Sequence, residues 1–301
     1  MPLLGAHVSV AGGLPLAVDR AAAQGCDALQ IFTKSSNQWR ARPLPPDEIR
    51  DFRERLERAG IGVAVAHASY LINLASSDPV VRGRSLASLG EEIDRVEALG
   101  LLGLVIHPGC ATTGTVEEGL RLIAAAVREA LRPRRGGRAL VILEQTAGQG
   151  RTLGWRFEQI ARILEHLDGH RRVAVCLDTC HLVAAGYGLA TAAGYSETFR
   201  AFDRLVGLDR LRVFHVNDSK RPIGSRVDRH DHIGRGHVGR GGFARLVNDR
   251  RFATLPMLLE TPKTGGRTPN DVAADPLDAM NLAALRSLLR SGTPCPRRAT
   301  S

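Results

Sequence analysis

The stretch VFHVNDSKRPIGSRVDRHDHIGRGHVG, residues 213–239, begins as an apolar strand and continues into a loop rich in imidazole and carboxylate side chains. His215 lies at the end of the strand, and Asp228, His230 and His232 follow in the loop. Neutral imidazole and carboxylate groups are the usual protein ligands of zinc-like ions. The stretch therefore suggests a metal site just beyond the carboxyl end of a buried strand.

Outward from this strand, short apolar runs alternate with amphipathic segments along the chain. The predicted strands are residues 3–8, 28–33, 62–66, 103–106, 139–143, 172–177, 211–216 and 256–259. The predicted helices are residues 13–24, 46–59, 79–99, 116–131, 155–167, 196–206, 241–250 and 276–290. Eight strand–helix units with almost continuously apolar strands predict an α/β fold, a single parallel (β/α)8 TIM barrel over residues 1–290. The basic tail, residues 291–301, is predicted to be flexible.

Polar side chains stand at or just beyond the end of every predicted strand. They are His7, Thr33, Lys34, His67, His107, Glu144, Asp178, His181, His215 and Glu260. The carboxyl ends of barrel strands converge on one face, where the active site is built. A lone His or Glu at such a position is more often structural, but so many together indicate two or three bridged metal ions. Such clusters are typical of phosphoester hydrolysis, in which metal ions activate water and absorb charge on the leaving oxygen.

Composition, cysteine content and net charge limit the cellular location and the partners that we expect for this protein. The 301-residue chain is 44% hydrophobic but has no apolar run long enough to span a bilayer, and it does not open with a secretory signal pattern, so we expect a cytoplasmic protein and no membrane association. Five cysteines without a CxxC pair indicate free thiols, with Cys176 in the core of a strand. The formal charge of +10 fits a polyanionic partner such as nucleic acid. Only three of the 41 basic residues are lysines, however, so a compositional bias toward arginine explains the charge equally well.

Five motifs together resemble a known family. They are GAHVSVAGGL at 5–14, HASYLINLA at 67–75, EQTAGQG at 144–150, LDTCH at 177–181 and LLETP at 258–262, alongside the 217–239 segment. The chain resembles endonuclease IV, the family 2 apurinic/apyrimidinic endonucleases, from residue 5 to about residue 262. The resemblance implies a monomeric base excision repair enzyme that acts on double-stranded DNA containing abasic sites. It would cut 5′ to the abasic sugar, leave a 3′-hydroxyl and a 5′-deoxyribose phosphate, and also remove 3′ blocking groups.

The same resemblance implies three Zn²⁺ ions per chain, with Mn²⁺ as a possible substitute. Carried over by motif, the first zinc would be held by His67, His107 and Glu144. The second would be held by Asp178, His215 and Glu260, with Glu144 as the bridge, and the third by His181, Asp228 and His230. Glu144 and Glu260 are the residues that we expect to be catalytic.

DNA recognition is implied for the loops that follow the strands. Tyr70 and Leu71 match the side chains that the family inserts into the minor groove beside a flipped-out nucleotide. Further predicted DNA contacts are Lys34, Asn37, Gln38, Lys220 and Arg229. Asn37 departs from the family, which often has an arginine there, and so leaves intercalation by this loop in doubt.

Other interpretations remain at this stage. Gly234, Gly236 and Gly239 satisfy GxGxxG, but no apolar strand immediately precedes them, so we expect no nucleotide cofactor. His7, His232 and His237 are expected to support the ligands or to face solvent. A metal-dependent sugar isomerase or epimerase would share the barrel and its ligand-rich strand ends, and a non-catalytic DNA-binding protein would share the charge.

Overall fold

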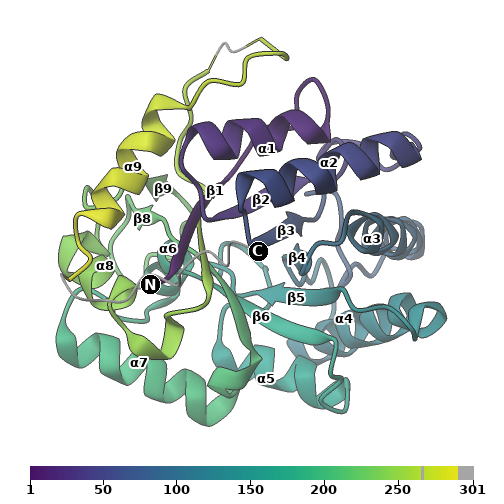
Figure 1. Cartoon of the computed structure of the whole chain (residues 1–301). Helices are drawn as coiled ribbons and strands as arrows, with labels where there is room; N and C mark the ends of the chain where they lie inside the picture. Colours follow the sequence, from purple (N-terminus) through teal and green to yellow (C-terminus); the bar gives the residue numbers. More distant parts are fainter. Residues whose placement is uncertain (266–267, 291–301) are drawn as a thin grey trace.

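The computed structural model describes residues 1–265 and 268–290, so the tail predicted for residues 291–301 lies outside the described chain. Parallel strands form a closed barrel (Figure 1). Their order around the barrel is β1-β10-β7-β6-β5-β4-β3-β2. They are β1 (Leu3–His7), β2 (Ala28–Phe32), β3 (Val63–His67), β4 (Gly103–Ile106), β5 (Leu140–Glu144), β6 (Val173–Asp178), β7 (Leu211–His215) and β10 (Pro256–Leu259). The ring closes because β1 pairs in parallel with both β2 and β10. The predicted TIM barrel is confirmed.

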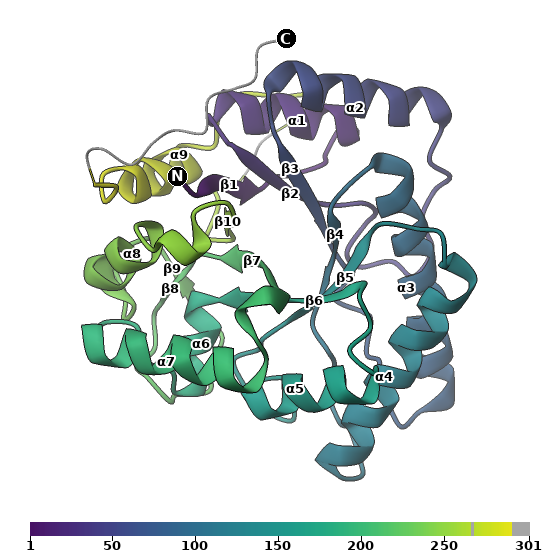
Figure 2. The ribbon, with the colours of Figure 1, turned by 60° about the horizontal axis from the view of Figure 1, so that its bottom comes forward.

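Helices surround the barrel on the outside (Figure 2). They are α1 (Leu14–Ala23), α2 (Pro46–Ala59), α3 (Pro79–Leu99), α4 (Val116–Leu131), α5 (Phe157–His166), α6 (Thr179–Ala185), α7 (Ala192–Leu205), α8 (Gly239–Val247) and α9 (Pro276–Arg286). Local sequence sets several boundaries. Asp78 caps α3 with its carboxylate, Thr115 forms a capping box with Glu118 at α4, and Gly100 ends α3 in the left-handed conformation.

Two apolar layers hold the fold together. One is a small cluster inside the barrel, which includes Val65, Ile142, Cys176 and Leu258, and the other lies between the strands and the helices. Gly5 is needed in the inner layer, since a Cβ atom there would lie 1.8 Å from the carbonyl oxygen of Ala28. Filling the barrel with side chains makes it a rigid support for the residues at its rim.

The structure adds elements that the sequence pattern did not predict. Helix α6 follows β6 directly, because the Asp178 carboxylate caps it by accepting the backbone N–H of His181. Strands β8 (Asp218–Ser219) and β9 (His230–Asp231) form a short antiparallel pair within the 213–239 segment. Helix α7 begins four residues earlier than predicted because Thr191 caps it, and α9 ends at Arg286 rather than at residue 290.

Two further sequence expectations bear on the molecule as a whole. No helix among the described residues is long and apolar enough to cross a membrane. Cys26, Cys110, Cys176 and Cys180 are free thiols, and Cys176 lies fully buried in the barrel core as predicted. Cys295 lies outside the described residues.

Candidate metal centre and nucleic-acid interface

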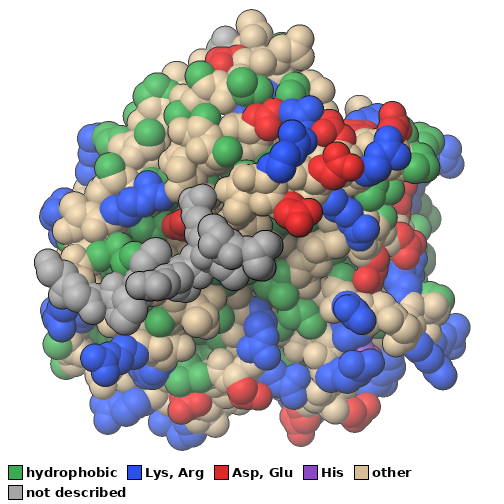
Figure 3. All heavy atoms as spheres, in the orientation of Figure 1, with side chains coloured by type: hydrophobic (Ala, Val, Ile, Leu, Met, Phe, Trp, Pro, Cys, Tyr) green, Lys and Arg blue, Asp and Glu red, His purple; other side chains and the backbone are tan. Residues whose placement is uncertain are grey.

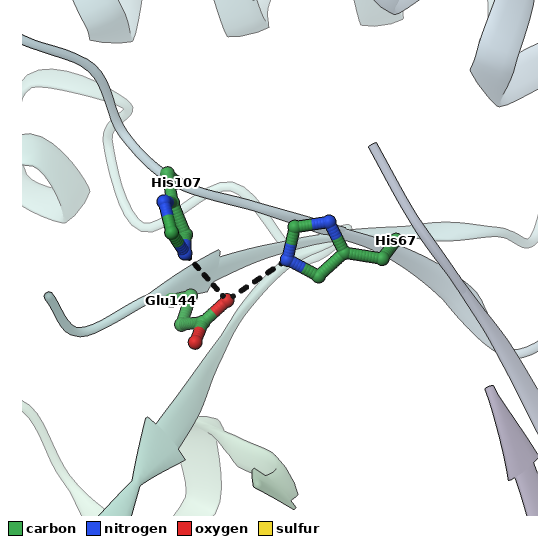
Figure 4. A group of neighbouring side chains, drawn as sticks. All are labelled: His67, His107 and Glu144. Atoms are coloured by element: carbon green, nitrogen blue, oxygen red, sulfur yellow. Dashed lines mark hydrogen bonds and ion pairs between the residues drawn. The ribbon is translucent and has the colours of Figure 1, made fainter. Parts of the chain in front are cut away.

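The first group of candidate ligands brings the ends of three neighbouring strands together. His67 ends β3, His107 follows β4, and Glu144 ends β5. The Nε2 atoms of His67 and His107 each lie 3.2 Å from Oε2 of Glu144, which places one carboxylate oxygen between two imidazoles (Figure 4). Glu144 is fully buried, so its charge must be balanced within the site.

The second group uses the other oxygen of the same carboxylate. Nδ1 of His215 lies 3.0 Å from Oε1 of Glu144 and 3.2 Å from Oε2 of Glu260, and Asp178 completes the set. The candidate ligand atoms in each group lie within 4.8 Å of one another. Glu144 therefore offers one oxygen to each group, which is the geometry of a bridging carboxylate.

The third group lies where α6 meets the loop that leads into β9. Nε2 of His181 and Nε2 of His230 are each 3.2 Å from a different carboxylate oxygen of Asp228. Asp178 also approaches His230, at 3.7 Å, and so connects this group to the second. The buried Nε2 atom of His230 lies at ion-pair distance from these two carboxylates but makes no well-aligned hydrogen bond within the described residues. A buried nitrogen that faces carboxylate oxygens without a well-aligned hydrogen bond, in a set of nitrogen and oxygen donors, fits a zinc-type ion.

The protonation of these residues reflects their mutual charge. Burial alone would lower the pKa of His230, but Asp178 and Asp228 raise it to about 9. Burial alone would raise the pKa of Glu144, yet His215 and His107 hold it well below its usual range. In the absence of cations from outside, protons on the imidazoles neutralise the carboxylates. A divalent ion would displace these protons, because metal ligands bind in their deprotonated forms.

Cys180 lies beside the third group, within reach of Asp228 and His230. Burial raises the pKa of its thiol, and the nearby Asp178 raises it further. A thiol held in its protonated form is a poor metal ligand. Nε2 of the predicted His181 lies 3.2 Å from Asp228, so both His181 and Cys180 stand beside this group.

Two polar residues that the sequence reasoning missed orient these candidate ligands. Gln30 is fully buried on β2. Its Oε1 atom lies 2.8 Å from Nε2 of His215, and its amide Nε2 donates a hydrogen bond to the Glu260 carboxylate. Asn217 donates from Nδ2 to Asp178 and accepts the backbone N–H of Glu260. The only signal for Gln30 was a lone amide in the apolar run ALQIF. Such partners fix the orientation of metal ligands and tune their basicity.

The predicted DNA-contact side chains on the rim are mostly exposed. Tyr70 is 64% exposed, and its ring meets the ring of Phe32 edge-on with centroids 5.4 Å apart. Leu71 beside it is half-buried. The remaining exposed members of the predicted set are Asn37, Gln38, Lys220 and Arg229. Phe32 and its neighbours thus hold a large aromatic side chain in water next to the candidate metal ligands, an arrangement suited to stacking on a base.

Lys34 requires a correction. It was predicted to contact DNA, but its side chain is only 2% exposed. Its ammonium donates to the Ser88 hydroxyl and to the carbonyl of Trp39, each at 2.7 Å, and lies 3.6 Å from the buried Glu92. In this position Lys34 is an interior residue that holds the loop after β2, because its charge is fully engaged by protein groups.

The glycine-rich part of the 213–239 segment has a structural explanation. A Cβ atom at Gly236 would lie 2.2 Å from the carbonyl oxygen of Ser219, so only glycine fits. The buried Asp218 carboxylate accepts backbone N–H groups from Gly234 and Val238. The glycines let the loop fold around Asp218 and beside the metal ligands.

His7, His232 and His237, which were given no ligand role, either contact a candidate ligand or lie nearer the surface. His7 contacts Glu260 at 3.4 Å and Gln30 at 2.9 Å through Nδ1, so it supports a ligand. His232 is 3.0 Å from the amide of Asn281, and His237 is exposed to solvent. His7 is therefore the supporting imidazole at the rim.

Sequence comparison identifies the family. A family described as a xylose isomerase-like TIM barrel matches residues 18–283. A protein from Chloroflexus aurantiacus named probable endonuclease 4 is 47% identical over 290 residues, covering 96% of this chain and 99% of its own. One of the same name from Geobacter sulfurreducens is 46% identical over 299 residues, covering 97% and 98%. The chain belongs to the endonuclease IV family. The crystal structure of endonuclease IV from Thermus thermophilus agrees with the family's fold, with a TM-score of 0.81 and 38% identity over 95% of this chain and 98% of that one.

The endonuclease IV fold is also shared with sugar epimerases. A D-allulose 3-epimerase from Methylomonas superposes with a TM-score of 0.66 at 19% identity, covering 96% of this chain and 97% of its own. At that identity the likeness shows the barrel alone. The resemblance inferred from sequence motifs is confirmed by the relatives at 47% and 46% identity, whereas the epimerase is 19% identical to this chain.

Proposed function

We propose that this protein is a zinc-dependent apurinic/apyrimidinic endonuclease of base excision repair, acting as a monomer in the cytoplasm. It would hydrolyse the phosphodiester 5′ to an abasic site and leave a 3′-hydroxyl and a 5′-deoxyribose phosphate. Removal of 3′ blocking groups would follow from the same chemistry. The observation that carries the proposal is the set of three ligand groups in which Glu144 gives one oxygen to each of two.

The residues present fit three zinc ions, with Mn²⁺ as a possible substitute, in the groups described above. Bound zinc would supply a nucleophile at neutral pH and would offset charge on the phosphate and the departing oxygen. Glu144 would set the spacing of the first two ions, and Glu260 would help to orient the attacking water. Gln30 would hold the Glu260 carboxylate in place through the hydrogen bond that it donates. Asn217 would hold the Asp178 carboxylate and the backbone of Glu260.

The rim would provide recognition of the lesion. A hollow of about 690 Å³ opens beside Glu260 and His230, and Tyr70 forms part of its wall. That volume is typical of pockets that bind small ligands, and so suits a sugar phosphate turned out of the helix. Tyr70 and Leu71 would occupy the gap that the nucleotide leaves in the duplex.

The decisive experiment uses an end-labelled duplex that carries one abasic analogue, with the protein's bound metal counted by elemental analysis. We expect one cut 5′ to the lesion by protein that holds about three zinc ions, and no cut once the metal is removed. Glu144→Gln should keep the fold and lose cleavage by about 10²-fold or more. Glu129→Gln on the exposed side of α4 is the matched control and should cleave normally.

Three results would count against the proposal. Unchanged turnover of Glu144→Gln at full zinc occupancy would remove the bridging role. Full metal occupancy with no cut in any abasic duplex would favour the sugar epimerase alternative, which is then tested on ketose substrates. A protein that bound DNA but held no metal would point to the non-catalytic alternative.

A further inference from the structure

A cluster of arginine side chains lies at the end of the barrel opposite the candidate metal ligands. Arg132 and Arg135 follow α4 and precede β5, while His170 and Arg171 precede β6. Connections from a helix to the next strand lie at the amino-terminal end of a (β/α)8 barrel, whereas the candidate ligands lie at the carboxyl end. These side chains line a hollow of about 440 Å³, together with Arg128, Leu131 and Arg172.

The guanidinium groups in this hollow differ in how they are engaged. Arg172 is buried and bound to Glu97 and to backbone carbonyls, so it forms part of the wall. Arg128 contacts the exposed Asp168 at 2.8 Å. Arg132, Arg135 and Arg171 are exposed and form no hydrogen bond or ion pair through their guanidinium groups within residues 1–265 and 268–290. The hollow therefore presents three guanidinium groups whose donors are free.

The pKa of His170 reflects the positive charge around this hollow. Burial lowers the pKa of its imidazole, and the charges of Arg172, Arg171 and Arg128 lower it further. No carboxylate figures among the groups that shift it, so the local field is positive. Arginines are frequent over the molecule, and Figure 3 shows Lys and Arg side chains interspersed with Asp and Glu on much of the face. This hollow differs because its cations converge and its acidic groups are few.

We propose that the hollow between the end of α4 and the start of β6 binds closely spaced phosphate groups, as a site separate from the metal centre. Guanidinium groups bind phosphate through paired, charge-assisted hydrogen bonds, and three of them on one concave surface match a chain of phosphates. The phosphates could belong to the backbone of a nucleic acid or to a free polyphosphate. A nucleic acid bound here would lie on the opposite end of the barrel from the lesion site, so one molecule could contact two DNA segments at once.

The test compares two triple variants that remove the same formal charge. The hollow variant carries Arg132→Gln, Arg135→Gln and Arg171→Gln. The control variant carries Arg84→Gln, Arg200→Gln and Arg204→Gln, which are exposed residues on α3 and α7. Both are titrated with inorganic tripolyphosphate by calorimetry and with undamaged duplex DNA by fluorescence anisotropy over a salt series, after a thermal melt has confirmed folding.

We expect the hollow variant to bind at least one probe about 10-fold or more weakly than the control variant and the unaltered protein. If the ligand is the nucleic acid backbone, its log–log salt dependence should fall by about 2 to 3, since each lost phosphate contact removes about 0.9. If only tripolyphosphate binding is lost, the site is one for free polyphosphate. Equal behaviour of the two triple variants toward both probes would overturn the proposal. Neither readout depends on cleavage, so the result stands apart from the endonuclease assay.

Discussion

The buried pair Lys34 and Glu92 offers a sharp test of how the rim loops are held. The Lys34 ammonium donates to the carbonyl of Trp39 in the loop after β2. Oε1 of Glu92 on α3 accepts the backbone N–H of Ser69, which precedes Tyr70 in the loop after β3. One ion pair therefore fixes the two loops that carry most of the predicted DNA contacts.

Lys34→Met should be costly, because it leaves the Glu92 carboxylate buried without a counter-charge. Removal of one partner from a buried pair typically costs about 3–5 kcal/mol. For a chain of this size that corresponds to a fall in Tm of roughly 5–8 °C. Burial already raises the pKa of Glu92, while the charge of Lys34 lowers it. Removal of the Lys34 charge should therefore raise the pKa of Glu92 further. The loss of stability should accordingly grow as pH rises above the unfolded pKa of a glutamate, and shrink under acid conditions.

The assay pairs thermal melts with steady-state kinetics on an abasic duplex. A second variant, Lys34→Met with Glu92→Leu, replaces the whole pair by apolar groups and should recover most of the stability. Because neither residue touches the metal ligands, kcat should change little in either variant, while KM should rise as the loops loosen. If the single variant lost less than about 1 kcal/mol, or the double variant were no more stable than the single one, Lys34 would not be the counter-charge that we describe.

Two further predictions concern the rim and the metal centre. Asn37→Arg adds a cation to an exposed loop position, so it should tighten binding of abasic DNA and steepen its salt dependence by about 1; identical affinities across a salt series would contradict this. In metal-free protein the raised pKa of His230, about 9, contributes stability that is present below its usual value of 6.5 and is lost as pH rises through 9. Zinc requires the neutral imidazole, so the Tm difference between zinc-loaded and metal-stripped protein should widen over that interval, and a narrowing gap would refute the assignment.

The positions of the candidate ligands could be predicted from sequence because barrel geometry leaves little freedom. A short apolar strand in a closed parallel barrel must deliver the residue at its carboxyl end to one rim. His67, Glu144 and His215 are all of this kind, and the structure brings them together. The imidazoles that face the two carboxylate oxygens of Glu144 are compatible with the bridging role that the family resemblance implied, which stays a prediction.

Burial of polar side chains was the part that sequence could not predict. Lys34 and Gln30 both follow or interrupt apolar runs, and nothing in their local pattern says whether they face the rim or the interior. Their environments depend on α3 and on strands far away in the sequence, as with the 185-residue separation of Gln30 and His215. Short elements capped by side chains were missed for the same reason, since α6 depends on the Asp178 carboxylate rather than on a periodic apolar face.

Charged side chains are balanced differently at the two ends of the barrel, and the difference bears on the exposed arginines of the hollow. At the carboxyl end, buried carboxylates such as Glu144 and Asp178 each face imidazoles, so their charges are balanced within the fold or by bound cations. At the amino end, Arg172 is balanced by Glu97, but Arg132 and Arg135 have no acidic partner among the described residues. Clustered like charges repel and destabilise the compact state unless an anion from outside offsets them. A phosphate-bearing ligand in the hollow would offset the charges of these arginines. Charge balance therefore favours bound cations at the carboxyl end of the barrel and bound anions at the amino end.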